Sequence, residues 1–95
     1  MMDKIEKVEM MDKILRELED LRNSQTSVMK KISKIEADNI NLGIEMLETK
    51  LVDVFVAVDS NLNLVSSLEE EFQEYRDKFY KDNKIDALKA AQEKG

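Results

Sequence analysis

The sequence predicts an all-α protein built as a long helical hairpin. Three observations favour this fold class: a heptad stripe of apolar residues runs along most of the chain, the stripe changes phase once near Gly43, and the 95 residues include no proline. Residues spaced alternately by three and four positions lie on one face of a helix, where a second helix can pack. A charged fraction of 38% with only two glycines is also typical of long helices.

The first helix is expected over residues 3–38. Gln25 continues the stripe spacing through the polar stretch 23–27, so we expect the helix to continue there as well. The apolar positions expected to form the oligomer seam in this helix are Ile14, Leu18, Leu21, Val28, Ile32 and Ile35.

A turn is expected over residues 39–43. The step from Leu42 to Leu47 is five residues, which at ~100° per residue swings the stripe by roughly 140° around the helix axis. Gly43 stands at this step, and glycine is the preferred residue just after a helix end. These features favour a fold-back of the chain; the alternative is one continuous, kinked helix.

The second helix is expected over residues 44–81, followed by a short helix over residues 84–93. Asn83 is a suitable N-cap for the short helix, with Asp86 in its first turn. The seam positions expected in the second helix are Leu47, Leu51, Val54, Val58, Val65 and Leu68.

Additional apolar residues, such as Leu15, Met29 and Phe55, lie beside the seam. A widened apolar stripe is typical of a bundle of three or four helices rather than of one helix pair. We therefore expect residues 1–95 to form a single domain that dimerises into a four-helix bundle or coiled coil.

Three stripe positions are polar: Gln25, Asn39 and Asn61. Buried polar residues at such positions can fix the register and the number of partners, at a cost in stability. The alternative is that packing opens there and these side chains meet water.

Four of the five aromatic residues lie close together near the end of the second helix: Phe72, Tyr75, Phe79 and Tyr80. Aromatic side chains dominate the energetics of many interfaces, so this cluster is a candidate surface for a protein partner. The alternative, which we favour, is that it forms the packed end of the bundle.

The net charge is −6, and residues 44–82 carry ten acidic and four basic residues. This balance disfavours binding to nucleic acid or anionic lipid, which require a basic surface. It is typical of a solvated helix face, and a basic partner or mimicry of nucleic acid are the alternatives. The longest apolar run, residues 54–58, is far shorter than the ~20 residues of a membrane span, so we expect no membrane association and a cytoplasmic location.

Catalysis is not expected. The sequence has no histidine and no cysteine, which removes the commonest general base and the thiolate nucleophile and metal ligand. The serines have no histidine to activate them, and no glycine-rich phosphate loop is present. We therefore expect no catalytic residue, no cofactor and no metal.

The composition and stripe predict a non-enzymatic interaction module: an oligomeric adaptor, inhibitor or assembly factor. Its expected partners are a second copy of itself and an unidentified protein. A chain of about a hundred residues with a turn glycine near position 43 also resembles the WXG100 family of secreted helical hairpins. That resemblance implies export by a specialised system. Asn41 stands where the family has tryptophan, and neither Tyr75 nor Tyr80 is followed four residues later by the acidic residue of the family's export signal.

Overall fold

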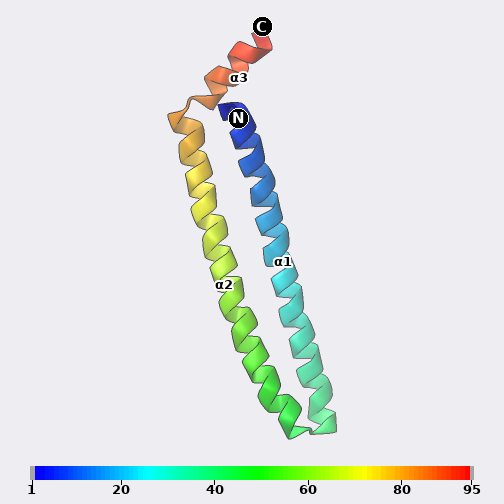
Figure 1. Ribbon diagram of the computed structural model, residues 1–95. Helices are drawn as coiled ribbons and strands as arrows, with labels where there is room; N and C mark the ends of the chain where they lie inside the picture. Colours follow the sequence, from blue (N-terminus) through cyan, green and yellow to red (C-terminus); the bar gives the residue numbers. More distant parts are fainter. Residues whose placement is uncertain (1, 95) are drawn as a thin grey trace. The chain divides into compact units, whose positions relative to one another are not determined.

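The computed structural model describes residues 2–94, which contain three helices and no strand. These are α1 (Lys4–Leu42), α2 (Glu45–Asp82) and α3 (Ile85–Lys94) (Figure 1). The two long helices pack against each other, so the predicted all-α hairpin with a short third helix is confirmed. The helices divide into two compact units: unit 1 contains residues 2–19 and 68–94, and unit 2 contains residues 20–67.

The start of α1 is fixed by a side-chain cap. The backbone N–H of Glu6 donates a hydrogen bond to Asp3 Oδ1 at 2.8 Å, and the Lys7 N–H donates to the Asp3 carbonyl at 3.0 Å. The first amides of a helix have no intrahelical acceptor, and aspartate is among the preferred residues for supplying one. Glu6 also places a negative charge in the first turn, where the helix dipole favours it.

The turn between α1 and α2 is shorter than expected, because α1 continues to Leu42 and only Gly43 and Ile44 separate it from Glu45, the first residue of α2. Asn39 makes this possible. Its Oδ1 accepts a hydrogen bond from the Ile44 N–H at 3.0 Å, and its Nδ2 donates to the Ile44 carbonyl at 3.0 Å. Gly43 has φ of 69°, the left-handed conformation that closes many helix ends. The chain therefore folds back and does not form one kinked helix.

The core of unit 2 is thin. Its buried apolar residues are Ile32 of α1 and Leu51 and Val65 of α2. Asn39 is also buried, and its two hydrogen bonds to Ile44 satisfy the amide, so its burial carries no desolvation penalty from an unpaired group.

Unit 1 has a compact cluster in which α3 covers the beginning of α1. Val8 and Ile85 are completely buried, Ile5 is nearly so, and Phe79 and Tyr80 of α2 pack against them. Burying a side chain such as Ile85 contributes roughly 1.5–3 kcal/mol, which explains why the ten residues of α3 are docked against the long helices.

The link between α2 and α3 differs from the expected one. The backbone N–H and side-chain Nδ2 of Asn83 both donate to the Phe79 carbonyl, at 3.0 and 2.9 Å. Asn83 therefore closes the end of α2 and does not cap α3. The first backbone acceptor of α3 is the Lys84 carbonyl, bonded by the Leu88 N–H, and Lys84 itself has φ of 49°.

Candidate interaction surface

The predicted seam residues separate into two sets of equal size. One set is buried or half-buried: Leu18, Ile32, Leu47, Leu51, Val58 and Val65. The other set is exposed, with 36% to 49% of each residue's surface accessible: Ile14, Leu21, Val28, Ile35, Val54 and Leu68. Leu15 and Met29 lie beside the predicted seam, yet they are half-buried and so more covered than the exposed seam residues Ile14 and Val28. The exposed positions are four of the six predicted in α1 and two of the six predicted in α2, so the predicted stripe is uncovered mainly on α1.

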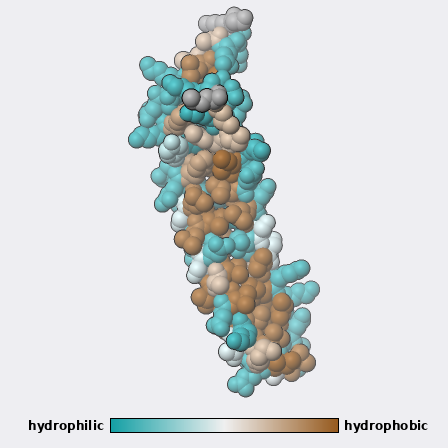
Figure 2. Space-filling view, viewed as in Figure 1, coloured by the Kyte–Doolittle hydropathy of each residue, from teal (hydrophilic) through white to brown (hydrophobic). Residues whose placement is uncertain are grey.

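In unit 2 the uncovered positions of α1 repeat every seven residues. Leu21, Val28 and Ile35 are each 43% exposed, and Val54 of α2 is 46% exposed. In both helices of this unit the exposed positions follow the inward ones by three residues. In an antiparallel pair, that offset directs both sets to the same side. Figure 2 shows apolar side chains gathered on the viewed face, over the part of both long helices near the turn. We call Leu21, Val28, Ile35 and Val54 the exposed stripe.

The three polar stripe positions have different surroundings. Asn39 is buried, and both polar atoms of its side chain are engaged by Ile44, so its position is explained by the turn. Gln25 is half-buried within α1, and Asn61 is exposed on α2.

The aromatic cluster is divided in a similar way. Phe79 and Tyr80 pack against the core of unit 1, and Phe72 is half-buried. Tyr75 is 60% exposed, and its ring stacks on that of Phe72 with centroids 6.4 Å apart and an interplanar angle of 15°. The structure thus leaves one of the four rings largely available to a partner.

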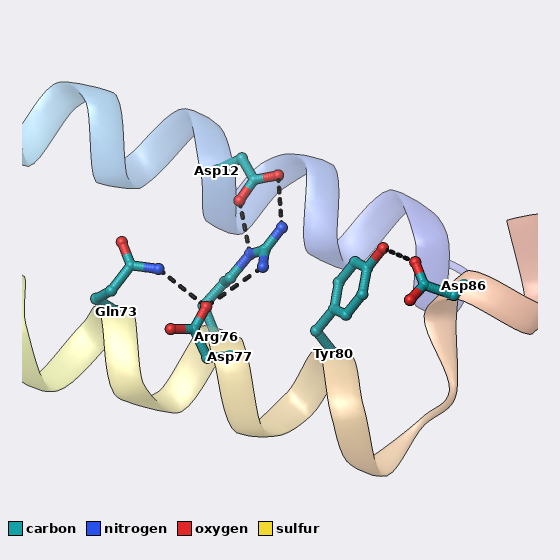
Figure 3. A network of polar contacts seen from close by, with 6 residues as sticks. All are labelled: Asp12, Gln73, Arg76, Asp77, Tyr80 and Asp86. Atoms are coloured by element: carbon teal, nitrogen blue, oxygen red, sulfur yellow. Dashed lines mark hydrogen bonds and ion pairs between the residues drawn. The ribbon is translucent and has the colours of Figure 1, made fainter.

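A polar network in unit 1 was not predicted from the sequence (Figure 3). Arg76 of α2 donates from Nε to Asp12 Oδ1 at 2.8 Å and from Nη2 to Asp12 Oδ2 at 3.3 Å, a two-pronged ion pair. The guanidinium also lies 4.6 Å from the centroid of the Tyr80 ring, and the Tyr80 hydroxyl is hydrogen-bonded to Asp86 of α3. The available sequence signal was an arginine between Phe72 and Phe79 on the inward face of α2.

Two groups of this network have shifted pKa values. The hydrogen bonds from Arg76 to Asp12 raise the pKa of the guanidinium above its ordinary value. The hydrogen bond to Asp86 raises the pKa of the Tyr80 phenol, because it favours the neutral form of the phenol beside a carboxylate. In both cases the hydrogen bond stabilises the protonated form of the group, which is the form that makes the contact.

Two further properties of the described chain concern metal binding and membrane insertion. Within residues 2–94, no group of three acidic side chains lies close enough to hold a metal ion. By length and composition alone, α2 could cross a membrane, and it is the one helix of the described chain that passes this test. Helices of soluble proteins also pass it.

Comparisons with known proteins add no family to this description. A scan of models of protein families, a search of curated proteins and a search of solved structures gave no match.

Proposed function

We propose that this protein is a non-enzymatic interaction module that associates with itself through the exposed stripe, with a four-helix dimer as the simplest assembly. The observation that carries the proposal is the regular exposure of Leu21, Val28 and Ile35 at successive heptad positions. Apolar residues at this spacing on a stable helix are the pattern by which helices recognise other helices.

The amount of exposed surface supports the proposal. The accessible surface is 7409 Å² for a chain of 11.0 kDa. A folded monomer of this mass exposes about 5,600 Å² on average. The excess is about 1,800 Å², whereas each partner in a standard protein interface buries only about 800 Å². The chain therefore has ample surface for a stable dimer interface.

A protein partner accounts for the exposed stripe better than a lipid bilayer does. The apolar part of α2 contains Asp53 and Asp59, and both are exposed. An aspartate at the centre of a membrane span costs about 2.5–3.5 kcal/mol. In a helix bundle, the two carboxylates stay in water.

The proposal is tested by one substitution on the exposed stripe and a matched one away from it. Val28→Glu would place a charge in the interface, so we expect light scattering to show a monomer that keeps its helical circular dichroism. Val56→Glu is the matched control, because Val56 is also an exposed valine of unit 2 but lies outside the exposed stripe. We expect the Val56→Glu protein to remain a dimer. A Val28→Glu protein as strongly associated as the unmodified chain would contradict the proposal.

A second candidate, a secreted hairpin like those of the WXG100 family, is supported by the two helices of 39 and 38 residues and by the turn at Gly43. Release into the culture medium that requires a secretion ATPase would support it. Retention in cells with an intact system would oppose it.

A further inference from the structure

We infer that the occupant of the exposed stripe is a second copy of this chain, with its α1 packed antiparallel to the first α1 and the two-fold axis near Ser24. The inference rests on the proposed function, since it specifies the partner and geometry of the same surface. It is carried by the order of charges along α1 within unit 2.

One flank of the exposed stripe has a regular sequence of side chains. Acidic, small and basic residues follow one another at steps of three and four, and all are exposed: Asp20, Ser24, Ser27, Lys31 and Lys34. This spacing places them along one edge of α1, beside Leu21 and Val28. From residue 20 to residue 34 the edge is thus acidic at one end, uncharged and small in the middle, and basic at the other end; Asp38 continues the same edge one turn later.

Such an edge is complementary to itself only when reversed. In an antiparallel pair that sets Leu21 against Val28 of the second copy, Asp20 lies opposite Lys31 of that copy. Ser24 then lies opposite Ser27 of the second copy, where small side chains allow close approach.

The other arrangements do not bring the opposite charges of this edge together. In a parallel pair the two-fold axis runs along the helices, so the edge of one copy lies on the opposite side of the seam from the same edge of the other copy, and Asp20 does not meet Lys31. In an antiparallel pair shifted by one heptad, Asp20 would lie opposite Asp38 of the second copy. Like charges at such positions are unfavourable and select against the shifted pairing.

A second copy is the occupant for which this order has a physical reason. A two-fold symmetric interface uses the same patch on both partners, so the patch must be complementary to itself, and every contact is made twice. The charges of the described α1 edge fulfil this condition, and its apolar stripe supplies the buried centre.

Disulfide trapping tests the geometry directly, because the sequence contains no cysteine and each introduced thiol is the only one in its chain. Leu21→Cys and Val28→Cys proteins, carrying tags of different mass, are refolded together and oxidised. We expect mainly the mixed dimer, in which the thiol introduced by Leu21→Cys is bonded to the thiol introduced by Val28→Cys. Equivalent thiols of the antiparallel pair are about 10 Å apart along the axis, beyond the roughly 4.4–6.8 Å between Cα atoms in a disulfide.

Preferential linkage of each variant to itself would show a parallel pair and overturn the inference. So would an absence of disulfides in a protein that sediments as a dimer, although the proposed function would survive both results. A monomeric unmodified chain would overturn the inference and the proposed function together.

Charge reversal keeps the inference testable if the cysteine variants assemble poorly. Asp20→Lys would face Lys31 of the second copy in two symmetric contacts, and we expect the association constant to fall roughly ten-fold. The double variant Asp20→Lys/Lys31→Asp restores the opposite charges, so we expect it to recover to within about two-fold of the unmodified chain. A double variant as weak as the single one would contradict antiparallel pairing.

Discussion

Arg76 and Asp12 lie 64 positions apart in the sequence, yet their side chains form a two-pronged ion pair that joins α2 to α1 in unit 1. The Arg76 side chain is 21% exposed, and its guanidinium is held between the Asp12 carboxylate and the ring of Tyr80. Planar, two-pronged recognition of a carboxylate requires the geometry of arginine. This pair therefore sets how the two helices align at this end of the hairpin.

Arg76→Lys should lower the free energy of unfolding by about 1 kcal/mol, because lysine keeps the charge but loses the second hydrogen bond and the stacking on Tyr80. Urea unfolding followed by circular dichroism measures the difference. Lys78→Arg is a suitable control on an exposed residue of the same helix, and it should have no effect. Equal stability of Arg76→Lys and the unmodified chain would show that the ion pair is not structurally important.

Asn39→Ala should cost about 1–3 kcal/mol, because the backbone N–H of Ile44 loses its acceptor in the turn and the Ile44 carbonyl keeps only the hydrogen bond from the Glu48 N–H. Asn39→Asp keeps an acceptor for the Ile44 N–H and loses only the donor to the Ile44 carbonyl. Its free energy of unfolding should therefore lie between those of the unmodified chain and the Asn39→Ala protein. Light scattering of both variants distinguishes the turn role from control of oligomer number. An altered number of subunits with unchanged stability would contradict the turn role.

Gly43 and Lys84 should respond oppositely to changes of backbone freedom, since both have positive φ, 69° and 49°. Gly43→Ala should destabilise the protein by about 1 kcal/mol, and the space around Gly43 is open, so strain in the backbone is the only cost. Lys84→Gly should relieve strain and stabilise it by up to about 1 kcal/mol. Thermal unfolding of both variants checks the pair, and a stabilising Gly43→Ala would contradict the turn geometry.

The phenol of Tyr80 should titrate above its ordinary pKa of 10.0, because its hydrogen bond to Asp86 favours the neutral form. The stability that this contact contributes is therefore fully present below pH 10 and is lost as the pH rises through the folded pKa. In a Tyr75→Phe protein, Tyr80 is the only tyrosine, and its ultraviolet absorbance reports its titration alone.

Replacing Asp86 provides the comparison for this titration. In the Tyr75→Phe background, Asp86→Asn removes the carboxylate beside the phenol, and the absorbance midpoint should move down towards 10. Identical midpoints with and without Asp86 would show that the contact between α2 and α3 does not control the phenol.

The hairpin could be predicted from the sequence because its signals are local and repeated. The spacing of Leu18, Gln25 and Ile32 defines a helix face, and the phase change beside Gly43 defines the turn. The helix α1 is longer than expected, since it continues to Leu42 and the Asn39 amide forms two hydrogen bonds to Ile44 across the turn.

The orientation of each helix could not be predicted, because a heptad pattern does not say which neighbouring positions meet the intramolecular partner. Val28 and Ile32 are equivalent in the sequence pattern, yet Ile32 is buried and Val28 is exposed. The pairing of Arg76 with Asp12 has no local signal, since it depends on the register between helices that are distant in sequence.

Sedimentation equilibrium of the unmodified chain is the most direct test of self-association through the exposed stripe. At a concentration of tens of micromolar, a stable dimer should give a mass twice the 11.0 kDa of the single chain. Dilution should reveal a reversible equilibrium with the monomer. A mass of one chain over the whole concentration range would contradict the account.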